Sequence, residues 1–225
     1  MNILGIETAT AACALGVRTE AGAEVTRVVG GDRRHTEALA LEMRRVLDEL
    51  DLSSRDIGRV AVDRGPGLFT GLRVGVATAI AFAQGLGVDV VGVTSLELLA
   101  HGARDLGARG RVVSCVDGRR GEVFVQAFTV DESIAALDEP RVTTARDVAV
   151  TWATSGAPVT FTGDGVERYR DDFAAVPNGS IVDQRVPSVH AMLEIATWRG
   201  PDRVVTPLYL READAVANFS TRQRP

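Results

Sequence analysis

The order of hydrophobic and polar positions predicts an alternation of strands and helices. Short apolar runs typical of strands occur at 2–6, 13–18, 24–29, 59–62 and 88–93. The first three runs follow one another closely, which is the pattern of a hairpin meander. The longer gaps after the third run leave room for helices between the remaining strands.

Helical spacing of apolar residues fills these gaps. Thr36 can cap a helix that runs to Leu50, along which Leu39, Met43 and Leu47 recur on one side. A second helix follows the loop 64–71 and ends before Gly85 and Gly87, and Ser95 caps a third that extends through His101.

The second half repeats this order more loosely. Strands are predicted at 111–116, 122–130 and 158–162, and helices at 144–154 and 187–198. Each half opens with a buried strand that ends in an acid and a small residue, at Glu7-Thr8 and at Asp117-Gly118. We therefore predict an α/β protein of two duplicated lobes, 1–106 and 107–225.

The helix after the loop 64–71 has an unusual composition. Gly71, Gly75, Ala79 and Ala83 recur every four residues, so one edge has almost no side chain, and most other positions are apolar. A helix that is apolar all round is buried all round. We expect the sheet to cover one side, and either the helix 36–50, another subunit or both to cover the other.

The loop 64–71, Arg-Gly-Pro-Gly-Leu-Phe-Thr-Gly, has two interpretations. Glycines before a helix amino terminus form a backbone nest that suits an anion. A tight turn that needs positive φ explains the same glycines. We favour the turn because the loop lacks the Lys-Ser/Thr pair of a phosphate loop and the spacing of a GxGxxG motif.

Acids at the two hairpin tips are the second candidate for chemistry. If the tips face each other across a cleft, the acids lie where actin-like and hexokinase-like proteins hold the phosphates and metal of a nucleotide. The alternative is that each acid bonds the amides of its own turn. The residues of this candidate vestigial nucleotide cleft are Glu7, Thr8, Thr10, Asp117 and Gly118.

Composition excludes several classes of function. The 225 residues carry a net charge of −5, which disfavours strong direct binding to a nucleic-acid backbone. Cys13 and Cys115 lie in apolar runs without a CxxC pair, as expected for buried thiols in a reducing compartment. The chain opens without a signal-peptide pattern, and its longest apolar stretch, 74–83, is about half of a membrane span. We expect a soluble cytoplasmic protein without membrane contact.

The sequence contains no pattern that predicts a nucleophile–base pair or a metal centre. It has no GxSxG motif, and its three histidines are scattered. His35 opens an HxxxH spacing, but Leu39 takes the second position. We predict no catalytic residue and no metal ligand in this chain.

Five segments together resemble the TsaB (YeaZ) family. They are ILGIETATAACALGV, HTEALALEM, DRGPGLFTGLRVGVATAIAFAQGLGVDVVGVTSLELLA, CVDGRRGEVFVQAF and TPLYLREADA. The resemblance extends over nearly the whole chain in order, and the long central segment is its most specific part.

The resemblance implies an actin-like (ASKHA) fold with two ribonuclease-H-like lobes, mixed sheets and flanking helices. It implies a role in making threonylcarbamoyladenosine in tRNA, as a non-catalytic partner of the TsaD-type transferase and a TsaE-type ATPase. ATP and Mg²⁺ are then used by the complex, and this subunit requires no cofactor. The resemblance also implies tRNA contact only through the complex and a homodimer in isolation.

The resemblance places the partner surface on the two first-lobe helices, at Leu39, Met43, Leu47, Gly71, Val74, Gly75, Thr78 and Ala79. Leu39 departs from the metal pair of the TsaD-type paralogue, and Glu7 stands where actin-like proteins prefer Asp. The alternatives are a nucleotide-binding enzyme of the same fold, either an ATPase or kinase-like protein or a mis-named M22 glycoprotease, and a homodimeric scaffold without a role in modification.

Overall fold

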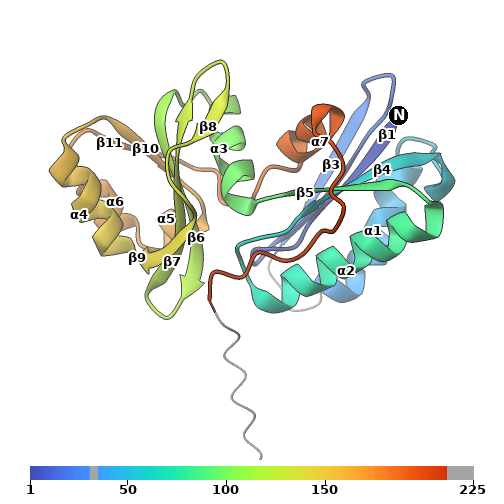
Figure 1. The fold of residues 1–225 in the computed structure, drawn as a ribbon, viewed down its shortest axis with the longest axis horizontal. Coiled ribbons are helices and arrows are strands. Elements are labelled where there is room, and N and C mark those ends of the chain that lie inside the picture. The colour runs from blue at the N-terminus through green and yellow to red at the C-terminus, as the bar shows by residue number, and fades with distance from the viewer. Residues whose placement is uncertain (31–34, 212–225) are drawn as a thin grey trace, which may run out of the picture.

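The computed structural model describes residues 1–30 and 35–211, with the backbone alone at 35–38. Two sheets stand side by side, each flanked by helices (Figure 1). The first sheet has the strand order β3-β2-β1-β4-β5 and the second has the order β11-β10-β6-β7-β8, with β9 also paired to β7.

The first lobe follows the predicted order of elements. Its elements are β1 (Asn2–Glu7), β2 (Cys13–Arg18), β3 (Glu24–Val29), α1 (His35–Asp48), the short 3-10 helix η1 (Ser54–Asp56), β4 (Ile57–Asp63), α2 (Phe69–Leu86), β5 (Asp89–Val93) and α3 (Ser95–Asp105). The first three strands are antiparallel, whereas β4 pairs parallel to β1 and β5 parallel to β4.

The second lobe repeats this connectivity. Its elements are β6 (Gly110–Arg119), β7 (Glu122–Val130), β8 (Ile134–Ala136), β9 (Arg141–Thr144), α4 (Ala145–Ser155), β10 (Val159–Thr162), α5 (Asp164–Arg168), α6 (Arg170–Ala174), β11 (Gly179–Val182) and α7 (Val189–Trp198). An antiparallel hairpin, β6–β7, is again followed by strands parallel to the first one, β10 and β11. The repeated topology confirms the predicted α/β fold of duplicated lobes.

The last helix of each lobe packs against the sheet of the other lobe. On α3, Leu96 and Leu99 are buried in one cluster with Phe124 and Phe128 of β7. On α7, Met192 and Leu193 are buried in a cluster that contains Ile3 of β1. A division of the chain between residues 106 and 107 therefore assigns α7 to the second lobe by its place in the sequence. By its contacts, α7 belongs to the first sheet.

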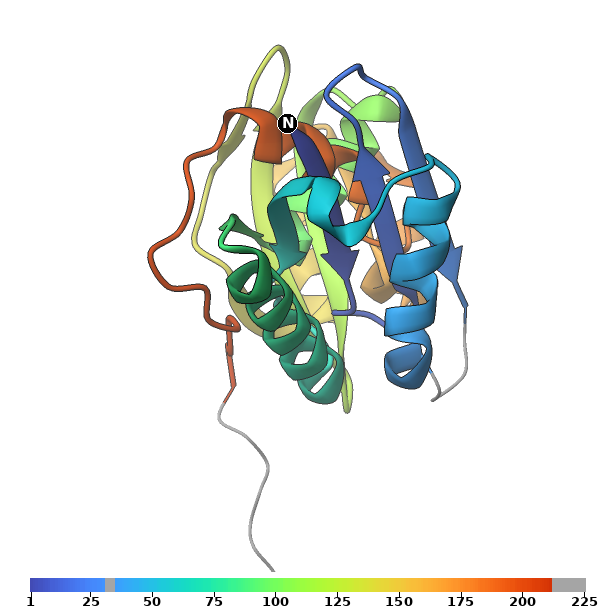
Figure 2. The ribbon, with the colours of Figure 1, turned by 90° about the vertical axis from the view of Figure 1, so that its right-hand side faces the viewer.

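Helices α1 and α2 lie next to each other on the face of the first sheet that α7 leaves free (Figure 2). Leu39, Met43 and Leu47 of α1 share one buried cluster with Val76 and Ala79 of α2. The apolar stripe predicted on the first helix is therefore core. By length and composition alone, α2 is the single helix of the described residues that is apolar enough to cross a membrane. A helix that covers the sheet of a globular domain satisfies the same criteria.

The small-residue edge of α2 faces the turn between β1 and β2. A Cβ atom built on Gly67 would lie closer than 3.0 Å to the carbonyl oxygen of Ala9, and one built on Gly71 equally close to that of Thr8. One built on Gly75 would overlap the hydroxyl of Thr8 in the same way. The glycines thus allow backbone to touch backbone, and their edge is filled from within the chain.

This contact predicts a large effect of one methyl group. Gly71→Ala should destabilise the fold by roughly 2–3 kcal/mol, because the new Cβ meets a backbone carbonyl that cannot move aside alone. Gly85→Ala on the same helix is the matched control, since nothing lies within 4 Å of its Cβ position. The control should stabilise the fold by up to about 1 kcal/mol through helix propensity. Urea unfolding of the two variants measures the difference, and equal midpoints would contradict the contact.

Candidate functional site

Carboxylates end the central strands of both sheets. They are Glu7 at the end of β1, Asp63 at the end of β4, Asp117 near the end of β6 and Asp164 just after β10. Because β4 pairs parallel to β1 and β10 parallel to β6, the acids of each lobe lie at one edge of their sheet. We call the site formed by these four residues the acid cleft.

In the first lobe, each acid holds a turn with one oxygen. Glu7 Oε1 accepts hydrogen bonds from the amides of Ala9 at 2.6 Å and Thr10 at 3.3 Å. Asp63 Oδ1 accepts from the amide of Gly65 at 2.7 Å and from Ser95 Oγ at 2.8 Å. The second oxygen of each acid is buried and has no hydrogen-bond partner among the described residues.

In the second lobe, the acids hold a turn and two arginines. Asp117 Oδ1 accepts from the amide of Arg119 at 2.9 Å, and its Oδ2 pairs with the guanidinium groups of Arg119 at 2.9 Å and Arg168 at 3.6 Å. Asp164 Oδ1 accepts from the amide of Asp117 at 2.9 Å. Among the described residues, Asp117 is thus the acid of the cleft that has ion-pair partners.

Burial raises the pKa of three of these acids. It raises the pKa of Glu7 well above its ordinary value, and the charges of Asp63 and, more weakly, Asp164 add to this. Burial also raises the pKa of Asp63 to about 7 and that of Asp164 to about 6. The acids of the two lobes therefore act on one another, and the cleft holds less negative charge near neutral pH than four ordinary carboxylates would.

All five residues predicted for the cleft lie where the first hairpin of each lobe turns: Glu7, Asp117 and Gly118 in the ends of β1 and β6, and Thr8 and Thr10 in the β1–β2 turn. Thr8 is buried and donates from its hydroxyl to the carbonyl of Gly71 at 2.9 Å, whereas the Thr10 hydroxyl donates to Ala12 O at 3.5 Å. Gly118 packs against the backbone of Glu122. Glu7 and Asp117 both bond amides of their own turns, which is the simpler of the two interpretations. Binding of a nucleotide here stays the alternative interpretation.

Asp63 and Asp164 belong to the same site, and neither was among the residues predicted for it. Each follows an apolar strand, as Glu7 does, but neither stands at a hairpin tip, so the pattern used to find the first two acids passed over them. The signal that could have found them is the repeat itself. In each lobe an acid stands at the end, or two residues past the end, of the strand that pairs parallel to the first strand.

The loop before α2 does not offer an open nest for an anion. The amide of Leu68, which precedes the first residue of α2, donates to the carbonyl oxygen of Ala9 at 2.6 Å. A backbone carbonyl from the β1–β2 turn thus takes a donor that an anion would need. Positive φ occurs in this loop at Gly65, which supports the tight-turn interpretation.

The residues assigned to a partner surface divide into two groups. Leu39, Met43, Leu47, Gly75 and Ala79 are buried within this chain, so in this fold they do not offer side chains to a partner. Gly71, Val74 and Thr78 are partly exposed. The assignment is therefore corrected for the five buried residues. A periodic pattern of small and apolar residues marks an edge of a helix, but it does not say whether that edge faces the sheet or the solvent. The side chains of His35 and Thr36 lie outside the described residues.

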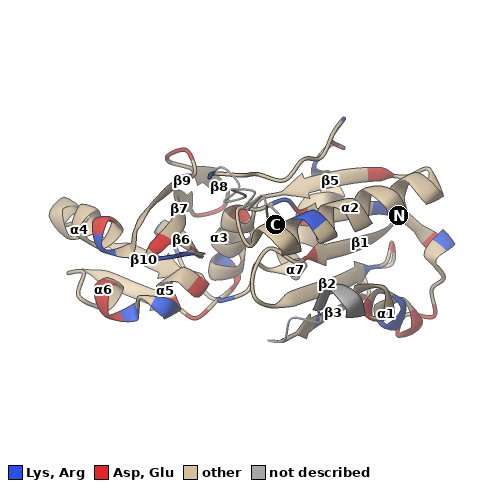
Figure 3. Ribbon diagram, turned by 90° about the horizontal axis from the view of Figure 1, so that it is seen from below, with Lys and Arg blue, Asp and Glu red and all other residues tan. Residues whose placement is uncertain are grey.

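The exposed positions of α2 form a different stripe. They are Thr70, Arg73, Ala77, Ala81, Gln84 and Gly85. Arg73 is the only charged residue of the helix, whereas charges elsewhere are spread over both lobes (Figure 3). One face of α2 is therefore open in the single chain, and its expected cover by another subunit stays a prediction.

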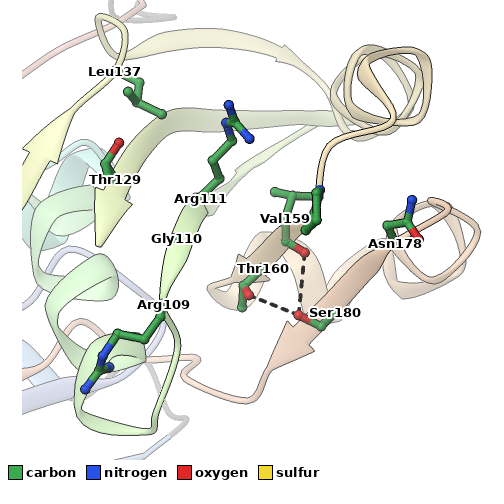
Figure 4. Close-up of a pocket in the computed structure, with 10 residues that line it drawn as sticks. Arg109, Gly110, Arg111, Thr129, Leu137, Val159, Thr160, Asn178 and Ser180 are labelled. Carbon is green, nitrogen blue, oxygen red and sulfur yellow. Dashed lines mark hydrogen bonds between the residues drawn. The ribbon is translucent and has the colours of Figure 1, made fainter. Parts of the chain in front are cut away.

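A cavity of about 470 Å³ lies at the opposite edge of the second sheet, where β6 and β10 begin (Figure 4). The side chains of Arg109 and Arg111 point in opposite directions there. Arg109 donates to the carbonyls of Arg104 at 2.8 Å and Ala108 at 2.7 Å. The arginines of this cavity therefore do not converge on one anion. The acid cleft and α2 remain the candidate sites.

Comparison with known proteins identifies the family. The family model described as "TsaD: tRNA N6-adenosine threonylcarbamoyltransferase" matches residues 24–198. The chain is 34% identical over 133 residues to the tRNA threonylcarbamoyladenosine biosynthesis protein TsaB of Escherichia coli, a match over 59% of this chain and 57% of that protein. It is 32% identical over 218 residues to an uncharacterized protein of Mycobacterium tuberculosis, over 95% of this chain and 93% of that protein.

Comparison with solved structures leads to the same family. The YeaZ structure from Pseudomonas aeruginosa superposes with a TM-score of 0.80 at 25% identity, over 93% of this chain and 99% of that chain. The chain belongs to the TsaB (YeaZ) family. A Bacteroides thetaiotaomicron protein with an actin-like ATPase fold superposes with a TM-score of 0.51 at 9% identity, over 87% of this chain and 95% of that chain. That likeness shows the fold alone, and the two lobes are those of an actin-like protein.

The raised pKa of Asp63 predicts a loss of stability with rising pH. The folded protein keeps a proton that the unfolded chain releases near the ordinary pKa of 3.8, so the stabilisation is full below that value and is lost as the pH rises toward about 7. Asp63→Asn does not titrate but keeps an acceptor for Gly65 and Ser95. Relative to wild type, the variant should gain on the order of 2–3 kcal/mol in unfolding free energy between pH 4 and 8.

Urea unfolding at a series of pH values measures this gain. Asp131→Asn is the control, because it removes an exposed carboxylate from the β7–β8 turn and should shift stability by a small, nearly constant amount. Parallel curves for wild type and Asp63→Asn would show that Asp63 is an ordinary carboxylate in the folded protein.

Proposed function

We propose that this chain serves in the synthesis of threonylcarbamoyladenosine in tRNA as a non-catalytic subunit. In this proposal it docks on a TsaD-type transferase, and a TsaE-type ATPase joins the complex. The chain requires no cofactor of its own, the complex uses ATP and Mg²⁺, and tRNA is contacted through the complex. The proposed location is the cytoplasm, and in isolation the chain forms a homodimer.

The observation that carries the proposal is membership of the TsaB family. The Escherichia coli relative is named for threonylcarbamoyladenosine biosynthesis, and the matching family model is named for the transferase itself. The fold similarity to YeaZ extends over nearly all of both chains, so the proposal does not depend on one shared motif.

The non-catalytic part of the proposal is supported by what the acids and Leu39 do. Three of the four acids of the cleft accept hydrogen bonds from amides of the turns that follow them, and Asp164 accepts one from the amide of Asp117. Leu39, at the second position of the HxxxH spacing, is 2% exposed and packs in the first-lobe core. A histidine there would face apolar side chains and not an open site.

The open face of α2 is the proposed docking surface. Ala77 and Ala81 are exposed on it, and Val74 and Thr78 flank them partly exposed. Small side chains without charge let a second helix approach closely and cost little to dehydrate. Leu41 on the neighbouring helix α1 is 54% exposed, which extends the apolar surface toward α1.

Reconstitution with the TsaD-type and TsaE-type proteins of the same organism tests the role. We expect threonylcarbamoylation of tRNA to require this chain and to fall to background when it is omitted. Undiminished modification without it would contradict the proposal. Size-exclusion light scattering of the chain with the TsaD-type protein tests the docking separately.

Charge on the open face of α2 should break the docking. Ala77→Glu and Ala81→Glu each place a carboxylate in the proposed interface, and we expect at least about a hundredfold weaker binding of the TsaD-type partner, because the charge must be buried without a partner. Stability should change little, since both positions are exposed helix sites.

Val150→Glu is the matched control for this experiment. Val150 is 56% exposed on α4, which flanks the second sheet away from the first lobe (Figure 1). Its substitution should leave the affinity unchanged. Unweakened binding by folded Ala77→Glu and Ala81→Glu proteins would place the docking surface elsewhere.

A nucleotide-binding enzyme of the same fold is the second candidate. It is favoured by the buried carboxylate oxygens of Glu7 and Asp63 that lack hydrogen-bond partners within residues 1–30 and 35–211. Calorimetric titration with ATP and Mg²⁺ separates it from the first. Saturable binding that is lost in Asp63→Asn would favour this candidate, and no heat at millimolar nucleotide would remove it.

A further inference from the structure

The chain that follows α7 crosses from one lobe to the other. Residues 199–211, which we call the strap, run along the outer edge of β5, pass the loop before α2 and reach the β6–β7 hairpin (Figures 1 and 2). None of the sites described above uses this segment. It joins the two turns that carry Asp63 and Asp117.

The first half of the strap is fixed to the first lobe. The amide of Asp202 donates to Val90 O at 2.9 Å, and its Oδ2 accepts from the amide of Gly92 at 2.7 Å. Val205 is buried in the same cluster as the helices α1 and α2. The amide of Leu208 then donates to Arg64 O at 2.6 Å, which brings the strap onto the loop just after Asp63.

Tyr209 ties the strap to the start of α2. Its ring centroid lies 5.0 Å from that of Phe69, and its hydroxyl accepts from Arg73 Nε at 3.1 Å. The guanidinium of Arg73 also lies 3.7 Å from the centroid of the Phe69 ring. The cation of Arg73 and the rings of Phe69 and Tyr209 thus form one cluster that fixes the strap at the amino end of the helix.

Arg211 reaches the second lobe. Its guanidinium pairs with Glu122 Oε2 at 2.7 Å, donates to the carbonyl of Gly118, and lies 5.3 Å from the centroid of the Phe124 ring. Leu210 beside it packs against the cluster that α3 forms with the second sheet. Gly118 follows Asp117 directly, so this contact is made at the turn that the acid cleft uses.

The hairpin that receives Arg211 has a strained turn. Arg119 has a φ of 64° and Arg120 a φ of 55°, in the left-handed region that residues with a Cβ adopt at a cost of roughly 1–2 kcal/mol. Asp117 holds the amide and the guanidinium of Arg119 from one side. Arg211 holds Gly118 and Glu122 from the other, so the strap helps to maintain the turn.

We infer that the strap is an interlobe clasp that holds the acid cleft closed along one side. The lobes are joined by the buried helices α3 and α7, which contact each other and each pack on the sheet of the other lobe, and the strap supplies a separate connection from Arg64 to Gly118. With the clasp in place the lobes do not rotate about the α3–α7 pair. Without it, the α3–α7 pair acts as a hinge and the cleft opens. This inference does not depend on the role in tRNA modification.

Distance measurements between the lobes test the clasp. Spin labels on Gln84→Cys of α2 and Val150→Cys of α4 report the separation of the lobes, since both positions are exposed. The native thiols do not compete for label, because Cys13 and Cys115 are buried and burial raises the pKa of both. In Arg211→Ala we expect the distance distribution to broaden and to gain a second population.

Hydrogen exchange gives a second readout on the unlabelled protein. Amides of the β6–β7 turn should exchange about tenfold faster in Arg211→Ala, the change expected from loss of a charge-assisted contact. Glu122→Gln, which keeps the shape but removes the ion pair, should have a smaller effect in the same direction. Tyr209→Ala releases the strap at its first-lobe end and should broaden the distances as Arg211→Ala does.

Arg203→Ala is the matched control. Arg203 is exposed on the same strap and makes no ion pair with the other described residues, so its loss removes the same charge without touching the clasp. Thermal unfolding by circular dichroism establishes that each variant is folded. A folded Arg211→Ala protein with the same distance distribution and the same exchange rates as Arg203→Ala would overturn the clasp.

Discussion

The contact between the β1–β2 turn and the glycine edge of α2 sets the geometry of the first lobe. Carbonyl oxygens of Thr8 and Ala9 lie where side chains on Gly71 and Gly67 would be, and the amide of Leu68 donates to Ala9. The turn can come this close only because those positions have no Cβ. Glu7 stands immediately before the turn and holds two of its amides. The place of the acid cleft and the direction of α2 thus depend on one backbone contact.

The same contact explains why the two candidate sites have different characters. In a phosphate-binding loop, the amides before a helix point at a ligand. Here one of those amides is used by the chain itself, so the glycines serve packing. Since the small-residue edge is turned inward, the open face of α2 is defined by Ala77 and Ala81, and the helix can cover the sheet while it keeps a flat surface toward solvent. An edge of small residues is therefore a poor guide to the side on which a partner binds.

Much of the fold could be predicted from the sequence because its signals are local. The β1–β3 meander, the helix that begins near Thr144 and the helix that ends at Trp198 depend on neighbouring residues. The cap of α3 was misplaced by one residue: it is Thr94, whose hydroxyl accepts from the amide of Glu97, and not Ser95. The short strands β8, β9 and β11 have only three or four residues each and depend on pairing with distant strands, which no local pattern records. The exchange of α3 and α7 between the lobes is also invisible locally. The apolar faces of both helices could cover either sheet, so the sequence pattern does not say which sheet each helix packs against.

The buried acids show why burial has to be known before a carboxylate is given a role. From sequence, Glu7 and Asp117 are equivalent members of a repeat. In the structure, Asp117 pairs with two arginines, whereas Glu7 and Asp63 each keep one buried oxygen without a partner in the part of the chain that the structure describes. A carboxylate in that position is stabilised by taking up a proton, which is the direction in which burial shifts both pKa values. A protonated acid still accepts the turn amides with its other oxygen, but it no longer supplies the negative charge that a metal ion requires. The acids of the first lobe can therefore hold their turns without adding a buried negative charge.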